Sequence, residues 1–277
     1  MKFDNETDLP RISIVTPTFN SSEFFESTIK SIRSQEYRNF EWIVIDGGST
    51  DNTINLIKEN SDIISYWVSE PDTGMYDAIR KGFEIASGEI GYWLNSDDIL
   101  LPWALQTVVN IFIRNPSCHW LTGFCTSMGT KNIPEPWLPI VFPQSILKRG
   151  YGHGKAWGFI QQESTFFNMN LYRKVGGINP SYKLAGDFDL WNKMACMVRL
   201  YTIRVELGCF RIHKNQLSSD MERYYEEVIE AGGKQFKLLR TIALLYSTVL
   251  YFVSRSKRTL FVGAIPHVDS NTTFDSF

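Results

Sequence analysis

Residues 93–102 have the sequence WLNSDDILLP, a short apolar stretch interrupted by two adjacent aspartates. Asp97 and Asp98 repel each other, and aspartate is unfavourable in β-strands. The pair therefore either ends a strand and begins the next helix, or binds a cation. Mg²⁺ and Mn²⁺ prefer oxygen ligands and are commonly held by one or two carboxylates together with substrate phosphates. The surrounding sequence has to decide between these alternatives.

Short apolar segments alternate with amphipathic ones around this stretch. Strands are predicted at 12–16, 40–46, 64–68, 89–94 and 120–124, and helices at 54–60, 75–86 and 102–114, with a further amphipathic stretch after Ser21 and Ser22. This alternation predicts an α/β fold with a mostly parallel central sheet flanked by helices. Ligands bind such sheets beyond the carboxyl ends of the strands. We therefore expect the strand-end residues to share one rim: Pro17, Asp46, Glu70 and Asp97.

The composition is that of an ordinary folded protein. The chain has 277 residues, of which 43% are hydrophobic and 21% charged, so it can bury a substantial core. The formal net charge of −2 argues against a general polyanion binder, and no nucleic-acid partner is expected. The four cysteines form no C-x-x-C pair, and the first residues contain no apolar signal region. These features predict a reduced, cytoplasmic setting.

The C-terminal part is basic and apolar. No acidic residue occurs between Glu230 and Asp269, whereas six basic residues do: Lys234, Lys237, Arg240, Arg255, Lys257 and Arg258. The apolar run 238–253 is shorter than the roughly 20 residues that span a bilayer. The segment 234–258 therefore predicts either peripheral contact with the cytoplasmic face of a membrane or a helix that packs in the core or in a homodimer. The sequence leaves these alternatives open.

The sequence GGSTDNT at 47–53 follows the second predicted strand. It matches neither G-x-G-x-x-G nor a P-loop, so the dinucleotide fingerprint and the P-loop are both absent. Its residues favour a tight turn and the start of a helix. Asp46, directly before it, is either a turn-forming residue or a carboxylate exposed at the binding rim.

A second acidic cluster, AGDFDLW at 185–191, lies at the start of a predicted helix, 187–197. Asp187 and Asp189 are each either N-terminal capping residues or functional groups. One of them could remove a proton from a sugar hydroxyl, because general bases are commonly Asp, Glu or His.

Residues 129–158 are rich in Gly, Pro and Trp and predict either a long covering loop or a poorly ordered insert. Sugars stack on aromatic faces, so Trp137, Tyr151 and Trp157 could form an acceptor platform. The alternative is that they only pack within the loop.

Six motifs occur in an order that resembles family 2 glycosyltransferases. They are VTPTFN (15–20), VIDGGSTDNT (44–53), SEPDTGMYDAIRKG (69–82), YWLNSDD (92–98), QQESTFF (161–167) and GDFDLW (186–191). The resemblance covers roughly residues 10–215. It implies the GT-A fold, an inverting reaction, a nucleoside-diphosphate-sugar donor that we expect to be UDP-linked, and Mn²⁺ or Mg²⁺ as the cofactor.

Matched position by position, the resemblance assigns roles to individual residues. The implied nucleotide-sugar site contains Thr16, Pro17, Asn20, Asp46, Gly48, Asp72, Lys81, Asn95, Ser96 and Asp97, with Asp46 accepting the imino proton of the base. Asp98 and Asp97 would bind the metal ion, and His213 is either a further ligand or a surface loop residue. Asp187 matches the catalytic base. The candidate acceptor contacts are Trp157, Gln162, Glu163 and Asp189.

Two positions depart from the family pattern. Asn95 stands where many members have Asp, although two carboxylates remain. Gly186 stands where Glu commonly precedes the base, a change that we expect to affect acceptor binding more than the chemistry.

The resemblance divides the chain into three parts. Residues 1–128 are expected to bind the nucleotide sugar, 129–215 to bind the acceptor and supply the base, and 216–277 to form a C-terminal helical extension. The implied function is sugar transfer to a glycan or lipid-linked acceptor in polysaccharide biosynthesis. The alternatives are a nucleotidyltransferase and a non-catalytic protein that binds nucleotide or glycan. Nucleotidyltransferases more often have a Gly-rich, basic N-terminal loop for the triphosphate, and the sequence PTFNSSEFF at 17–25 is not such a loop.

Overall fold

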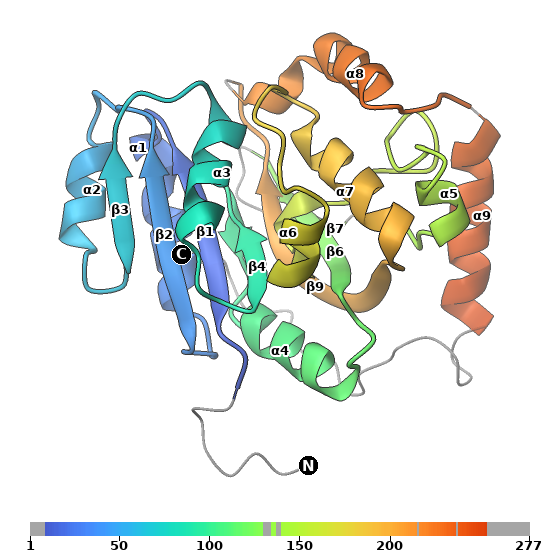
Figure 1. Cartoon of the computed structure of the whole chain (residues 1–277), viewed down its shortest axis with the longest axis horizontal. Coiled ribbons are helices and arrows are strands. Elements are labelled where there is room, and N and C mark those ends of the chain that lie inside the picture. The colour runs from blue at the N-terminus through green and yellow to red at the C-terminus, as the bar shows by residue number, and fades with distance from the viewer. Residues whose placement is uncertain (1–8, 130–133, 137–139, 215, 237, 254–277) are drawn as a thin grey trace.

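The computed structural model of the chain describes residues 9–129, 134–136, 140–214, 216–236 and 238–253 (Figure 1). Their elements, in chain order, are β1 (Ile12–Thr18), α1 (Ser22–Arg33), β2 (Phe40–Asp46), α2 (Thr53–Glu59), β3 (Tyr66–Ser69), α3 (Met75–Ile85), β4 (Ile90–Trp93), β5 (Ile99–Leu100), α4 (Ala104–Arg114), β6 (Trp120–Met128), β7 (Pro134–Pro136), α5 (Gln144–Leu147), β8 (Thr165–Asn168), α6 (Met169–Lys174), α7 (Gly186–Met197), β9 (Tyr201–Arg211), α8 (Met221–Glu230) and α9 (Leu238–Val253). This is the α/β fold class expected from the sequence.

One sheet runs through the described part of the molecule, in the order β3-β2-β1-β4-β8-β6-β9-β5, with β7 paired to β6. Strands β3, β2, β1 and β4 are parallel, as predicted. Beyond them β8 pairs antiparallel with both β4 and β6, and β6 pairs parallel with β9. Thr18 is in register with Asp46, and Asp46 with Ser69, so three strands end at the same level and their loops share one rim.

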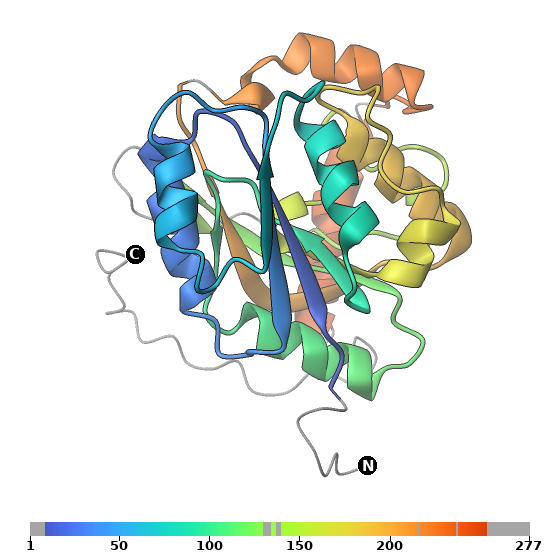
Figure 2. The same cartoon turned by 60° about the vertical axis from the view of Figure 1, so that its left-hand side comes forward.

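Each face of the sheet has its own hydrophobic core. Figure 2 shows α1 and α2 on one side of the sheet and α3 and α6 on the other. In β1, Ile12 and Ile14 pack with residues of α1, α2 and α4, whereas Val15 packs with residues of α3 and α7. This alternation follows from the period of two residues in a strand. The sheet is therefore buried on both faces, and its ligands have to approach at the strand ends.

Helix α7 is fixed to the sheet by a stack of indole rings. Trp191 lies against Trp93, the last residue of β4, with ring centroids 5.3 Å apart, and against Trp120 of β6 at 5.7 Å. All three side chains are at most 3% exposed. Because Asp187 lies one turn before Trp191, this stack sets the position of Asp187 relative to the loop that follows β4.

The long strand β9 was not among the predicted elements. It lies between β6 and β5 in the sheet, parallel to β6 and antiparallel to β5. Its sequence YTIRVELGCFR alternates apolar Ile203, Val205 and Leu207 with charged Arg204 and Glu206, which is the pattern of a half-buried strand. The strand delivers Arg211 and His213 to the rim from far downstream.

Residues 140–161, which we call the covering segment, consist of loops and the short helix α5. Helix α9 packs on this segment. Trp157 Nε1 donates a hydrogen bond to Val141 O (2.8 Å), its ring contacts Tyr246 of α9, and it is 3% exposed. Trp157 is therefore a packing residue and does not form an acceptor platform, while Trp137 lies outside the described residues.

Within the described part of the chain, no helix is both long and apolar enough to cross a bilayer. The apolar run predicted at 238–253 is the 16-residue helix α9.

Replacing Trp191 with Ala should lower the free energy of unfolding by about 3–5 kcal/mol, because it removes a large buried ring and leaves a cavity between α7 and the sheet. The free energy would be measured by urea denaturation. Met197, on the same helix, is 42% exposed, and its replacement with Ala should cost no more than about 0.5 kcal/mol. Equal losses for the two variants would contradict the role of the indole stack.

Candidate active site

Asp46 forms the floor of the turn after β2. Its two carboxylate oxygens accept five hydrogen bonds, from the hydroxyls of Thr18, Ser49 and Ser69 and from the backbone N–H groups of Gly48 and Ser49. Burial alone would raise the pKa of Asp46, but the hydrogen bonds from Ser49 and Ser69 outweigh it and lower the pKa. Asp46 is fully buried. The carboxylate therefore faces its own turn, as in the turn-forming alternative, and is not exposed at the rim.

Gly48 makes this turn possible. Its φ of 88° lies in the left-handed region, which a side chain would make unfavourable. That conformation aims the N–H groups of Gly48 and Ser49 at Asp46 Oδ2, at 3.0 and 2.8 Å. The role of Gly48 at the rim is thus to shape the backbone.

Thr16 was expected to line the nucleotide pocket, and the structure places it elsewhere. It is fully buried in β1, where its hydroxyl accepts a hydrogen bond from Trp42 Nε1 (2.9 Å). Pro17 is also buried, in register with Ile45. Both side chains are enclosed below the rim, because side chains alternate between the two faces of a strand and both faces here are covered.

The loops after β1 and β2 meet at the surface. Asn20 Oδ1 accepts a hydrogen bond from Thr50 N (2.8 Å), and Asn20 N donates to Ser49 Oγ (2.8 Å). Next to Asn20, the ring of Phe19 is 62% exposed. Sequence reasoning missed Phe19, although a large aromatic residue directly after a strand is a recognisable signal for a stacking surface.

Asp72 and Lys81 lie beside this rim, where β3 leads into α3. The carboxylate of Asp72 lies against Gly47, whose Cβ, if it had one, would be 2.9 Å from Asp72 Oδ2. Asp72 Oδ1 also accepts a hydrogen bond from Gly74 N (2.8 Å). Lys81 Nζ forms an ion pair with Glu70 Oε1 at 2.7 Å. These contacts bring both predicted residues to the edge of the rim.

The loop after β4 forms an acidic turn, residues 95–98. Asp98 is 1% exposed, and its oxygens accept hydrogen bonds from Arg211 N (2.9 Å) and Asn95 Nδ2 (3.2 Å). Burial, and next the negative charge of Asp97, raise the pKa of Asp98 well above its usual range. Ser96 ties the turn to the start of α1 through a hydrogen bond to Ser21 Oγ (2.7 Å). Two carboxylates in so little space favour either a bound proton or a bound cation.

The end of β9 lies against the acidic turn. His213 Nε2 is 2.9 Å from Asp97 Oδ2, and the imidazole rests on the ring of Phe24 with centroids 4.6 Å apart. Arg211 Nε donates a hydrogen bond to the backbone oxygen of Asp97 (2.9 Å). The structure thus brings His213 to the predicted metal residues. It adds Arg211, which sequence reasoning missed.

Gln162 and Glu163 also belong to this cluster, although they were predicted to contact the acceptor. Gln162 Oε1 accepts a hydrogen bond from Asn95 Nδ2 (3.1 Å), and Gln162 Nε2 donates to Trp93 O. Glu163 is 5% exposed. Burial raises the pKa of Glu163 to about 7, and the negative charges of Asp187 and Asp97 add to the effect. Glu163 therefore connects the acidic turn to the base candidate electrostatically.

Asp187 lies in the first turn of α7 and is half-buried. Its Oδ1 accepts a hydrogen bond from Phe188 N (2.7 Å) and shares the hydroxyl hydrogen of Tyr76 (3.3 Å) with Leu184 O, which lies 3.0 Å from that hydroxyl. Burial raises the pKa of Asp187 to about 6 despite these hydrogen bonds. A carboxylate with such a pKa is a stronger base than an exposed one, and near neutral pH it is still ionised.

The departure at Gly186 has a structural reason. A Cβ at this position would lie 2.8 Å from ring atoms of Tyr76. The ring that donates a hydrogen bond to Asp187 therefore occupies the space that a larger residue at 186 would need. Tyr76 was quoted within a motif but not identified as a site residue.

Glu227 of α8 supports the start of α7. Its carboxylate accepts hydrogen bonds from the backbone N–H groups of Lys183, Leu184 and Ala185, at 2.8–3.2 Å. These groups precede the helix and have no intrahelical partner of their own. Glu227 thus holds the segment that presents Asp187, and sequence reasoning missed it because it lies 40 residues downstream.

Asp189 was predicted to contact the acceptor, but its observed contact is with a neighbouring residue of the same helix. It is 8% exposed and forms an ion pair with Lys193, four residues later on α7. This is the spacing at which oppositely charged side chains on a helix meet.

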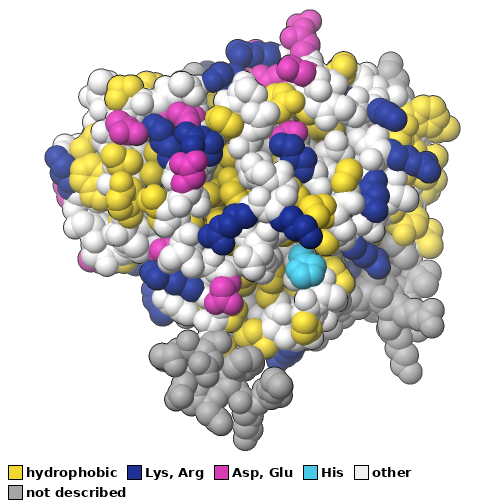
Figure 3. All heavy atoms as spheres, in the orientation of Figure 1, with side chains coloured by type: hydrophobic (Ala, Val, Ile, Leu, Met, Phe, Trp, Pro, Cys, Tyr) yellow, Lys and Arg dark blue, Asp and Glu magenta, His cyan; other side chains and the backbone are white. Residues whose placement is uncertain are grey.

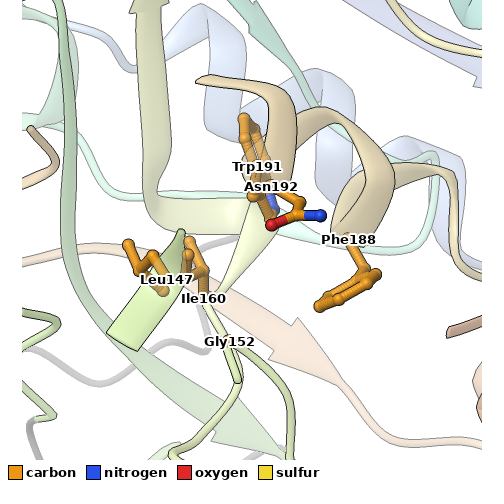
Figure 4. A pocket seen from close by; sticks show the side chains of 6 residues that line it. All are labelled: Leu147, Gly152, Ile160, Phe188, Trp191 and Asn192. Carbon is orange, nitrogen blue, oxygen red and sulfur yellow. The ribbon is translucent and has the colours of Figure 1, made fainter. Parts of the chain in front are cut away.

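A pocket lies on the side of α7 that faces the covering segment (Figure 4). It is lined by Leu147, Gly152, Ile160, Phe188, Trp191 and Asn192. Within the described residues, Trp191 Nε1 and Asn192 Oδ1 are buried without hydrogen-bond partners. A donor and an acceptor in one small pocket suit a bound water molecule. None of the predicted nucleotide-binding residues lines it.

The acidic turn has the donor chemistry of a magnesium or manganese site. Asn95 Nδ2 donates hydrogen bonds to Asp98 and Gln162. Asn95 Oδ1, in contrast, is buried without a partner among the described residues. Asp97, Asp98 and His213 lie beside it. Among the described residues, no group of three or more His, Cys, Asp or Glu side chains is placed so that it could hold a metal ion by itself. An open site fits these ions, because they commonly complete their coordination with substrate phosphates and water.

Comparison with known proteins identifies the family. The family model described as Glycosyl transferase family 2 matches residues 13–175. An uncharacterized glycosyltransferase of Mycobacterium tuberculosis is 31% identical over 205 residues, covering 73% of this chain and 75% of the relative. One from Haemophilus influenzae is 24% identical over 285 residues, covering 91% of this chain and 83% of the relative.

Solved structures show the same fold. TarS 1-349 of S. aureus in complex with UDP-GlcNAc has a TM-score of 0.63 at 16% identity, covering 88% of this chain and 73% of TarS 1-349. The mannosyltransferase PcManGT of Pyrobaculum calidifontis, in complex with GDP-Man and Mn²⁺, has a TM-score of 0.59 at 19% identity, covering 94% of this chain and 78% of that one. The chain has the GT-A fold of these enzymes, and by its sequence it belongs to glycosyltransferase family 2.

Proposed function

We propose that this glycosyltransferase transfers a sugar from a UDP-linked donor to a hydroxyl of a glycan or lipid-linked acceptor, with inversion at the anomeric carbon. The observation that carries the proposal is the stacking of Trp191 on Trp93, which places the start of α7, with Asp187, beside the strand that leads into the acidic turn. Such an arrangement suits a reaction in which a hydroxyl loses a proton while a diphosphate leaves.

The nucleotide would bind at the rim formed by the loops after β1, β2 and β3. Phe19 offers an exposed ring for stacking of the base, and the Asn20–Thr50 contact holds the two loops together. The complex of TarS with UDP-GlcNAc supports a UDP donor. Asp46 would act indirectly, by holding the 47–49 turn in a conformation that is ready for the ligand.

Mn²⁺ or Mg²⁺ would be held by Asp97 and Asp98, with the free Asn95 Oδ1 and His213 beside them, and would neutralise charge on the diphosphate. The complex of PcManGT with Mn²⁺ supports this choice of ion. Asp187 would accept the proton of the acceptor hydroxyl, and that hydroxyl would attack the anomeric carbon from the face opposite the diphosphate. Tyr76 would orient the Asp187 carboxylate through its hydrogen bond.

The test of the function is donor hydrolysis and transfer with a panel of UDP- and GDP-sugars, scored by the nucleoside diphosphate released. We expect activity with one or more UDP-sugars in Mn²⁺, loss of it with a chelator, and recovery when Mn²⁺ is restored. A nucleotidyltransferase would release inorganic pyrophosphate from a nucleoside triphosphate instead. A non-catalytic protein would bind the nucleotide without releasing any product.

Replacing Asp187 with Asn should lower turnover by about 10²- to 10⁴-fold, because the base is lost, while UDP affinity stays unchanged. Turnover would be followed by product release and affinity by calorimetry. Asp189→Asn is the matched control on the same helix and should retain activity, because Asp189 pairs with Lys193. If Asp187→Asn weakened UDP binding as much as turnover, the base assignment would be wrong.

The rate of transfer should depend on the proton of Asp187. Because its pKa is raised to about 6, kcat/KM should rise with pH up to about 6 and level off above it, since only the ionised carboxylate accepts a proton. The profile would be measured with saturating Mn²⁺. Glu163, whose pKa is about 7, could produce a similar limb. The limb near pH 6 should therefore persist in Glu163→Gln, and its disappearance there would assign it to Glu163.

Phe19→Ala should weaken UDP binding by about 5- to 150-fold, because stacking of a base on an aromatic ring contributes about 1–3 kcal/mol. Tyr66 provides a matched control, as it is 46% exposed on β3, and Tyr66→Ala should leave the affinity unchanged. Calorimetric titration with UDP would measure both. Equal affinity of the two variants would exclude Phe19 from the nucleotide site.

A further inference from the structure

Helix α9 has two apolar faces, and only one of them is covered. On the covered face, Ala243 and Ser247 are 0% and 4% exposed, and Ser247 Oγ accepts a hydrogen bond from Val141 N (3.0 Å). On the other face four apolar side chains are exposed, and we call them the outer stripe: Leu238 (60%), Ile242 (43%), Leu245 (63%) and Val249 (58%). Their spacing of four, three and four residues keeps them in one row along the helix.

Such a row is unusual on the surface of a folded protein, where the outward face of a helix is normally polar. Phe236, just before the helix, is 53% exposed and adds to the apolar surface. An uncovered row of this kind indicates an interaction site. The charges around it indicate what it binds.

The surroundings of the outer stripe are basic. Lys148, Arg149, Lys155 and Lys234 are exposed on the covering segment and on the chain that leads into α9. Arg240 of α9 is also exposed, and its guanidinium donates to Gly154 O (3.3 Å). Figure 3 shows hydrophobic side chains along the edge occupied by α9, with Lys and Arg side chains next to them. The sequence has no acidic residue between Glu230 and Asp269.

We propose that α9 binds in the interface of a membrane that contains anionic lipids, with the outer stripe among the acyl chains and the surrounding basic residues against the headgroups. An apolar helix face bordered by Lys and Arg is the pattern of a helix that lies in the membrane plane. Anionic headgroups attract the basic residues, and the apolar side chains leave water. The proposal is independent of the proposed catalytic mechanism.

The basic border disfavours a second copy of the chain as the partner. In a two-fold symmetric dimer, the same face of both subunits meets, so two sets of Lys and Arg would be brought together without acidic partners. Such apposition of like charges is unfavourable. An anionic surface supplies the opposite charge along the whole border.

The test is co-sedimentation of the full chain with vesicles of phosphatidylcholine alone and of phosphatidylcholine mixed with phosphatidylglycerol. We expect binding to the mixed vesicles, little binding to the neutral ones, and weaker binding as salt is raised and the charges are screened. Leu245→Glu should weaken binding to the mixed vesicles about tenfold or more, because it removes an inserted side chain and adds a negative charge.

Ile85→Glu is the matched control, since Ile85 is an exposed apolar residue (47%) at the end of α3, and this variant should bind as the natural chain does. Nucleotide affinity and circular dichroism should be unchanged in both variants. Equal binding to the two vesicle types, or equal binding of the two variants, would overturn the proposal. So would a dimer of the natural chain in sedimentation velocity that Leu245→Glu converts to monomer, because a second subunit would then cover the outer stripe.

Discussion

The candidate site depends on the packing of Trp191 against Trp93. Trp93 ends the strand that leads into the acidic turn, and Trp191 lies one turn beyond Asp187 on α7. One stacked contact therefore joins two parts of the chain about a hundred residues apart. Buried rings at native packing density tolerate little displacement. Asp187 and the acidic turn are consequently held in fixed positions relative to each other.

Much of this arrangement could be predicted from the sequence. The alternation of apolar and amphipathic segments identified the parallel strands at the N-terminal end, and parallel strands place their carboxyl ends at one rim. The order of the six motifs then added Asp187, although nothing near residue 187 indicates its distance from the acidic turn. His213 was a weaker candidate, because a surface loop histidine was an equally good interpretation of this position. Its contact with Asp97 depends on β9, which was not predicted.

The sequence could not show which of the candidate site residues are buried. Thr16, Asp46 and Trp157 belong to residue types that commonly bind nucleotides or sugars, yet all three are enclosed by their neighbours. Whether a side chain at a strand end faces a ligand or its own turn depends on one rotation of the backbone, such as the left-handed conformation at Gly48. The reason for a glycine at position 186 could not be predicted either, because the space for a side chain there is occupied by the ring of Tyr76, 110 positions earlier in the sequence.

The three hydrogen bonds that Glu227 accepts have a consequence for how the molecule is divided. The family signature ends at residue 175, and a boundary near 216 would follow from the motifs alone. Yet α8 contributes the carboxylate that satisfies the backbone just before Asp187. Local opening of α8 would release those N–H groups and loosen the base along with them. In hydrogen exchange, the beginning of α7 and the end of α8 should therefore behave as one cooperative unit.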